Sequence, residues 1–222
     1  MSAKISLDQA REYVAGLEMF GMRLGLDRVR ALAARLGDPQ KSYRTVHVVG
    51  TNGKSSTTRF ISSILQEHGL RVGTYVSPHL VSLAERQLVD GVASSDEEFY
   101  SLVAKIMPKA AEVEAGFKKG EVLTQFEVVT VAAYLHFKES KVDVAVVEAG
   151  LGGRWDATSI IESDVQVITT VALEHTEHLG ETTLAILEEK AAVIPKGGVV
   201  VAGSLDDDVA SRLRTILSLI HI

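Results

Sequence analysis

Short, nearly continuous apolar runs alternate along this chain with longer segments whose apolar residues recur every three or four positions. A continuous apolar run predicts a strand that is buried on both faces, because a half-buried strand would alternate with polar residues. Such runs predict strands at residues 46–49, 72–76, 142–148, 165–171 and 199–202. The periodic segments between them predict helices, so we expect the α/β class, with a mostly parallel sheet and helices on both faces.

Capping signals indicate where several of these helices begin and end. Ser6 can cap a helix that runs to about Phe20, and Gly37 follows a helix predicted over residues 27–36. Two further pairs fit the capping box that opens a helix: Ser95 with Glu98, and Thr124 with Glu127. Helical spacing also predicts a helix after the first strand, through Phe60, Ile61, Ile64, Leu65 and His68, and another over residues 183–194.

Composition narrows the class of protein. The chain has 222 residues, of which 46% are apolar and 23% charged, enough for one sizeable α/β domain. A net charge of -6 speaks against a nucleic-acid binder, and the lack of cysteine excludes disulfides and thiolate metal sites. We find no apolar run of about 18 residues and no secretory signal at the start, so we expect a cytoplasmic protein without a membrane partner.

The segment VHVVGTNGKSSTT carries the clearest chemical signal. A predicted strand leads into a glycine turn, and a helix follows, so backbone N–H groups and the helix N-terminus can bind a phosphate. Lys54 can reach the β- and γ-phosphates of a nucleotide, and a hydroxyl can bind Mg²⁺. The longer form of this motif fails because Val48 stands at its first glycine position. The predicted nucleotide-binding residues are Gly50, Thr51, Asn52, Gly53, Lys54, Ser55 and Ser56; the alternative is a purely structural glycine turn.

Glu148 is a candidate ligand for Mg²⁺ because it ends an apolar strand that could lie beside the phosphate loop. The glycine-rich residues 150–153 that follow suggest close approach of the backbone to a ligand. The alternative is a solvated acid at the end of a strand.

Several motifs together resemble those of a known family. They are GLDRVRALAARLGDPQ, the GTNGK loop, YVSPHL, Glu85-Arg86, Phe126-Glu127, VDVAVVEAGLGGRWDATS, ALEHTEHLG and EKAAVIPKGG. The loop resembles that of the Mur ligase superfamily, and the remaining motifs are similar to those of folylpolyglutamate and dihydrofolate synthases. The resemblance covers nearly all of residues 10–203, in the same order and spacing.

The resemblance implies roles for individual residues. Metal ligands would come from Ser55, Ser56, Ser77, Glu148, His175 and Lys190, with two Mg²⁺ ions and a Lys190 that reacts with CO₂ to a carbamate. Catalytic roles would fall to Lys54, His175 and Lys190, and substrate contacts to His79, Arg86, Arg154 and Asp156. Each residue also has a plainer alternative: a Pro turn at Ser77, a structural hydrogen bond at His175, and surface ion pairs for the lysine and arginines. Trp155 could pack against substrate or belong to the core.

Some positions depart from the common family pattern. Ser55 replaces a frequent glycine, Glu174 stands where aspartate usually precedes the histidine, and Ser159 stands where asparagine usually ends its motif. Val81-Ser82 lacks a basic residue that often follows the SPHL segment, which puts contacts on the folate side in doubt.

The implied reaction is an ATP-dependent ligation of L-glutamate to folate or dihydropteroate through an acyl phosphate. A cell-wall ligase acting on a UDP-muramoyl substrate and a nucleotide-binding fragment without turnover are the alternatives. We expect a helical lead-in at residues 1–45, an incomplete ATP-binding Mur-type domain at 46–216, and a missing C-terminal domain. Residues 217–222, LSLIHI, resemble translated sequencing adapter and are expected to be a non-native tail. We expect a monomer that is inactive as a ligase by itself.

Overall fold

The computed structural model of the chain describes residues 5–17, 25–118 and 120–220. Its α-helices are α1 (Leu7–Gly16), α2 (Asp27–Arg35), α3 (Lys54–Glu67), α4 (Asp96–Glu114), α5 (Gln125–Glu139), α6 (Thr176–Leu179), α7 (Thr183–Ala191) and α8 (Asp207–Ile220). Short 3₁₀ helices are η1 (Pro39–Lys41), η2 (Leu83–Arg86) and η3 (Ala157–Ile160). The strands are β1 (Arg44–Val49), β2 (Val72–Tyr75), β3 (Gln87–Val89), β4 (Val92–Ala93), β5 (Val144–Glu148), β6 (Val165–Ile168) and β7 (Val199–Ala202).

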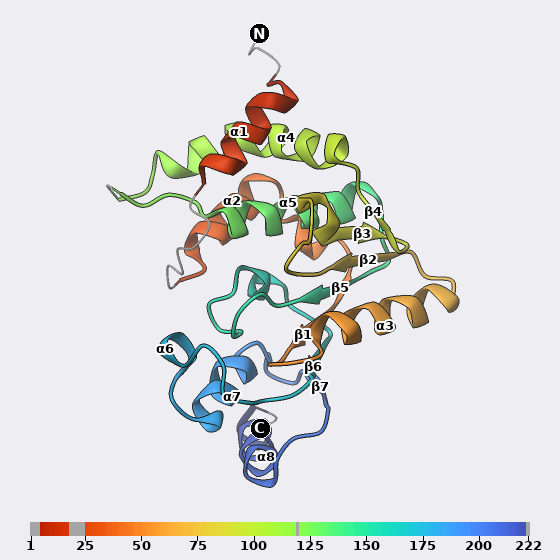
Figure 1. Cartoon of the computed structure of the whole chain (residues 1–222), viewed down its shortest axis with the longest axis vertical. Coiled ribbons are helices and arrows are strands. Elements are labelled where there is room, and N and C mark those ends of the chain that lie inside the picture. The colour runs from red at the N-terminus through yellow and green to blue at the C-terminus, as the bar shows by residue number, and fades with distance from the viewer. Residues whose placement is uncertain (1–4, 18–24, 119, 221–222) are drawn as a thin grey trace.

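The strands form one seven-stranded sheet in the order β4-β3-β2-β5-β1-β6-β7 (Figure 1). The strands β2, β5, β1, β6 and β7 are parallel to one another. β3 is antiparallel to β2 and forms a hairpin with β4 at one edge of the sheet. The predicted central pair is confirmed, because β1 and β5 lie side by side with Val48 opposite Glu148. The carboxyl ends of the parallel strands therefore lie together along one end of the sheet, and ligands bind at this end in open α/β folds.

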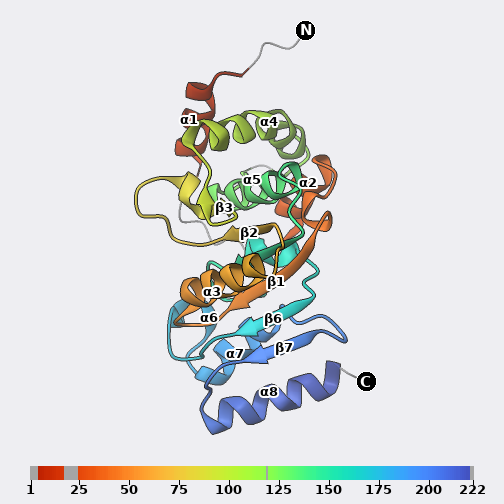
Figure 2. The same ribbon diagram turned by 90° about the vertical axis from the view of Figure 1, so that its right-hand side faces the viewer.

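Alternate residues along the strands face two different layers. On β5, Ala145 and Val147 belong to a core with α1, α2, α4 and α5. The alternate residues Val144 and Val146 belong to a smaller core under α3, on the opposite face of the sheet. Figure 2 shows α3 in front of the sheet. The expected layer of helices on each face is confirmed.

The two N-terminal helices are part of the main core. α1 packs on α4, and α2 packs on α4 and α5. Ala10 and Val14 are buried in the same cluster as Tyr75 of β2 and Phe137 of α5. The predicted helical lead-in thus lies directly on the layer that covers one face of the sheet.

Element boundaries differ from the expectations in several places. α1 ends at Gly16, and the predicted end at Phe20 lies outside the described residues. β6 ends at Ile168 rather than at residue 171, because the following residues turn onto the phosphate loop. The expected apolar face of α3 is partly wrong: Phe60 is 69% exposed and Ile64 58% exposed, while Thr58 and Ser62 face the sheet.

The hairpin β3–β4 and the helix α8 were not expected. The sequence Asp90-Gly91 forms the hairpin turn with two positive φ angles, which aspartate and glycine tolerate. α8 continues through residues 217–220, and Leu217 packs against the cluster formed with α7.

No helix within the described ranges is both long enough and apolar enough to cross a membrane.

Candidate nucleotide-binding site

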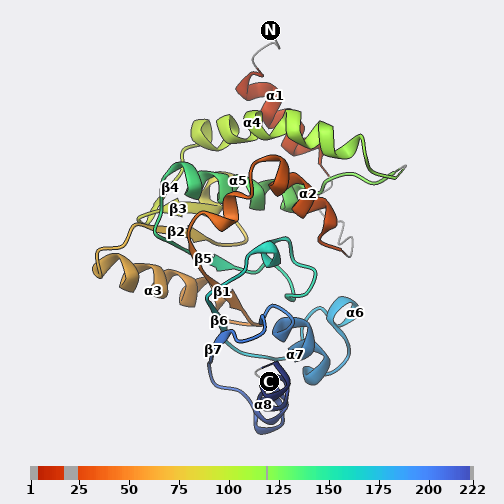
Figure 3. The same ribbon diagram turned by 180° about the vertical axis from the view of Figure 1, so that it is seen from behind.

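Four loops that follow parallel strands surround a cavity of about 900 Å³ at the carboxyl edge of the sheet. They are the phosphate loop after β1, the Ser77–Pro78 turn after β2, the glycine-rich loop after β5, and the segment after β6 that leads to α6. Figure 3 shows the loop after β5 lying between α2 and α6. The N-termini of α2 and α5 also line the cavity.

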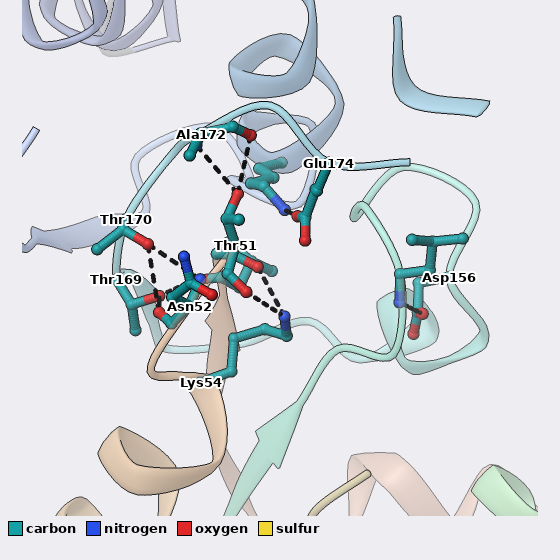
Figure 4. Close-up of polar contacts among 12 residues, drawn as sticks. Thr51, Asn52, Lys54, Asp156, Thr169, Thr170, Ala172 and Glu174 are labelled. Atoms are coloured by element: carbon teal, nitrogen blue, oxygen red, sulfur yellow. Dashed lines mark hydrogen bonds and ion pairs between the residues drawn. The ribbon is translucent and has the colours of Figure 1, made fainter. Parts of the chain in front are cut away.

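The phosphate loop has the geometry that its sequence predicts. Gly53 adopts a left-handed conformation with φ of 81°, and α3 begins at the next residue, Lys54. The Lys54 ammonium folds back over the loop and donates to the carbonyl oxygens of Gly50 at 2.8 Å and Thr51 at 3.0 Å (Figure 4). These neutral acceptors hold the cation at the mouth of the loop, where a phosphate oxygen could compete for it.

Glu148 links the loops after β1 and β2. Its Oε1 accepts from the Ser55 hydroxyl at 2.8 Å, and its Oε2 accepts from the Ser77 backbone N–H at 3.1 Å. Burial raises the pKa of Glu148, while these two hydrogen bonds and the charges of Lys54 and Arg59 act in the opposite direction. Of the two candidate serines, Ser55 is the one that contacts the carboxylate; Ser56 is exposed and lines the cavity.

Asp156 holds the glycine-rich loop after β5. It is 6% exposed; its Oδ2 accepts from the Leu151 N–H at 2.8 Å, and its Oδ1 accepts from the Thr158 N–H at 2.9 Å. Burial raises the pKa of this carboxyl, and the hydrogen bonds to Thr158 and the loop oppose that effect. The loop lies close to α5, since a Cβ placed on Gly150 would be 2.7 Å from the ring of Phe126. The carboxylate that was predicted to contact substrate thus already bonds to its own loop.

Lys190 is almost fully buried behind the cavity. Its Nζ lies 2.6 Å from Oε1 of Glu174, and its side chain is 1% exposed. Burial lowers the pKa of Lys190, and Glu174 opposes this shift. The neighbouring His175 lies at the start of α6 with φ of 43° and lines the cavity.

The other predicted substrate residues have different surroundings. Arg86 lines the cavity, donates from Nε to His79 Nδ1 at 3.1 Å, and lies 6.0 Å above the ring of Phe126. Burial and the Arg86 charge lower the pKa of His79. Arg154 pairs with Glu189 at 2.9 Å on the surface, which matches the plainer alternative for this residue.

Arg28, for which no role was expected, lines the cavity from α2. Its Nε lies 3.1 Å from Oε1 of Glu127 at the start of α5, and both side chains are mostly buried. In the sequence, Arg28 and Glu127 stand out only because each lies within one of the motifs that resemble those of the family. Trp155 also lines the cavity and is 44% exposed, so it is not a core residue.

The donor set around the phosphate loop fits a magnesium nucleotide. Mg²⁺ is usually held by one or two carboxylates together with phosphate oxygens and water, rather than by a cage of protein ligands. Glu148 with the Ser55 hydroxyl supplies such a partial set. Within residues 5–17, 25–118 and 120–220, no three His, Cys, Asp or Glu side chains cluster in a way that could hold a metal by themselves.

Comparison with known proteins agrees with this geometry. The model of the Mur ligase middle domain matches residues 48–220. The chain is 41% identical over 206 residues to the dihydrofolate synthase/folylpolyglutamate synthase of Bacillus subtilis, which covers 92% of this chain and 47% of that protein.

Solved structures are similar over almost the whole chain. A structure of Mycobacterium tuberculosis folylpolyglutamate synthase complexed with ADP has a TM-score of 0.88 and 34% identity, covering 96% of this chain and 48% of that one. E. coli FolC in complex with DHPP and ADP has a TM-score of 0.81 and 35% identity, covering 97% and 51%. The chain therefore spans about half the length of the relatives that it matches.

Proposed function

Because the chain belongs to the Mur ligase family through its middle domain, we propose that it forms the ATP-binding part of an enzyme that joins L-glutamate to a folate-type carboxylate. One arrangement carries this proposal: Lys54, Ser55 and the buried Glu148 converge where β1 ends and α3 begins. Such a loop places a cation, a hydroxyl and a helix N-terminus around one phosphate position.

In the proposed reaction, the substrate carboxylate takes the γ-phosphoryl group of ATP, and ADP leaves. The glutamate amine then attacks the activated carbonyl carbon, loses a proton, and displaces inorganic phosphate as the amide bond forms. The Lys54 ammonium and the N-terminus of α3 would neutralise and orient the phosphates, and positioning of this kind supplies most of the catalysis in phosphoryl transfer. Mg²⁺, held by Ser55 and Glu148, would neutralise further phosphate charge.

A second ion near His175 requires a different state of Lys190. As an ammonium paired with Glu174 this side chain cannot bind a metal; as a carbamate it could. Burial favours the neutral amine that reacts with CO₂. A carbamate ¹³C signal after incubation with labelled bicarbonate, lost in Lys190→Arg, would support the modification, and its absence would remove this second site.

Part of the cavity lining is suited to a planar, partly apolar substrate. Phe126, Trp155 and Arg86 belong to this lining, and they offer two aromatic faces and a guanidinium. The similar proteins carry names for folate ligases, and one of them was solved with DHPP. Both observations favour a folate-type substrate over a UDP-muramoyl substrate.

Nucleotide titration tests the proposed site. Lys54→Ala should weaken binding of Mg·ATP in calorimetry by roughly 10- to 100-fold, because a charged hydrogen bond to phosphate is lost. Lys138→Ala is the matched control, since the Lys138 ammonium also donates to a backbone carbonyl, that of Gly37 at 3.1 Å, far from the loop. Equal affinities of the Lys54 variant and the unchanged chain would contradict the proposed nucleotide site.

A further inference from the structure

The segment after β6 holds the phosphate loop from behind. A Cβ placed on Gly50 would lie 1.9 Å from Oγ1 of Thr169, so the base of the loop rests directly on this side chain. Gly50 has φ of 151°, and the close approach alone excludes a larger residue there. The phosphate loop and the segment after β6 are therefore packed directly against each other.

Hydrogen bonds fix the backbone of Asn52 at both its N–H and its carbonyl group (Figure 4). Its N–H donates to the Thr170 hydroxyl at 3.0 Å, and its carbonyl oxygen accepts from the Thr169 hydroxyl at 2.7 Å. The Thr170 hydroxyl also lies 3.3 Å from that carbonyl oxygen, which it can reach with its own proton.

Thr51 is held by the same segment. Its N–H donates to the Thr170 carbonyl at 2.8 Å, and its hydroxyl donates to the Ala172 carbonyl at 3.2 Å while accepting from the Ala172 N–H at 3.1 Å. The backbone N–H groups of Thr51 and Asn52 are therefore already used within the protein. The amides at the tip of the loop and the start of α3, from Gly53 onwards, are the ones left to face a phosphate.

We propose that Thr169 and Thr170 are positioning residues that set the phosphate loop in its binding conformation before the nucleotide arrives. This inference rests on the proposed function, since it concerns the same nucleotide site. A preformed loop loses little conformational freedom on binding, so removing the clamp should weaken phosphate binding even where the fold is kept. Both hydroxyls bond to the loop backbone at Asn52, and they act on the phosphates through it.

The test compares Thr170→Val, which removes the hydroxyl at nearly equal volume, with Thr170→Ser, which keeps it. Calorimetry with Mg·ATP and with inorganic tripolyphosphate should show affinity reduced roughly tenfold for Thr170→Val and by less than about twofold for Thr170→Ser. Both ligands should lose affinity by the same factor, because the clamp acts on phosphate binding. Thr215→Val on α8 is the control, since its hydroxyl bonds only within its own helix, to Ser211.

The outcomes separate the two proposals. If the unchanged chain binds neither ligand, the nucleotide site itself is wrong and the clamp falls with it. If the unchanged chain binds and Thr170→Val binds equally well, the clamp alone is overturned. Should Thr170→Val fail to fold, Thr169→Val and Thr169→Ser give the same comparison, and equal affinities of these two would overturn the clamp.

Discussion

His47 is a buried titratable residue at the centre of the sheet. It lies on β1, and its Nε2 is 2.9 Å from the Thr158 hydroxyl, which in turn donates to the Asp156 carboxylate. Because the Thr158 hydroxyl gives its proton to Asp156, Nε2 of His47 must be the donor to that hydroxyl. Burial lowers the pKa of His47 to about 4, so its ring is neutral at pH 7.

This residue should make the fold sensitive to acid. The unfolded chain takes up a proton near pH 6.5 and the folded chain only near pH 4, so the stability present above pH 6.5 is lost as the pH falls between these values. At pH 5 the loss should reach about 2 kcal/mol of unfolding free energy. His47→Gln keeps a donor for Thr158 and does not titrate, so urea unfolding at pH 7 and pH 5 should differ less for it. An equal drop in both proteins would contradict this explanation.

At the scale of single residues, local chemistry could be predicted and tertiary partners could not. The residues from Gly50 to Ser56 are adjacent in sequence, and Glu148 ends a strand that is both parallel to β1 and its neighbour, so the two strand ends meet. By contrast, the pairing of Lys190 with Glu174 depends on how α7 packs behind the loop after β6. The outward direction of Phe60 was missed because helical spacing shows which residues share a face but not which way the face points.

At the scale of elements, α5 depends on Glu127 in two ways. Glu127 completes the capping box with Thr124, whose N–H donates to it at 2.8 Å, and it pairs with Arg28 of α2. Glu98 completes an equivalent capping box at the start of α4 on the surface, with Ser95. The two helices therefore offer a matched pair of caps, one buried and one exposed.

Glu127→Ala should cost roughly 1.5–3 kcal/mol, because it removes one charged hydrogen bond of the mostly buried Arg28 as well as the cap. Glu98→Ala should cost only roughly 0.3–1.5 kcal/mol, the usual contribution of a helix cap. Chemical denaturation of both variants measures the difference. Similar losses in the two proteins would mean that the Arg28 pair adds nothing beyond the cap.

Most elements with strong period or capping signals were predicted, with α8 as the exception, and two short strands with weak signals were not. Both capping boxes on α4 and α5 have the predicted partners. The strands β3 and β4 escaped notice because they have only three and two residues and carry little apolar pattern. α8 was overlooked although Asp207 and Asp208 begin it and Val209, Leu213 and Ile216 recur along one face.

At the scale of the whole molecule, the 222 residues should bind nucleotide without joining glutamate to folate. The relative from Bacillus subtilis is about twice as long, with 47% of its length matched here. Ligation needs ATP, a carboxylate and an amine held together, and such positioning supplies roughly 7–11 kcal/mol of the barrier reduction. The measurement is ATP-dependent incorporation of labelled glutamate into tetrahydrofolate, beside the longer relative. Rates within about tenfold of that relative would refute the prediction, since tenfold is only about 1.4 kcal/mol.

The edge strand β7 should govern how the molecule associates. On one face of this strand Val200 packs with α7 and α8, whereas Val199 and Val201 are 57% and 53% exposed. An exposed apolar edge can pair with another chain, so a monomer in dilute solution should begin to self-associate as concentration rises. Val201→Lys should suppress this association in light scattering, because a charge on the edge blocks strand pairing. Val92→Lys on the two-residue strand β4, at the other edge, is the control, and suppression by both variants alike would show that added charge, rather than the β7 edge, is responsible.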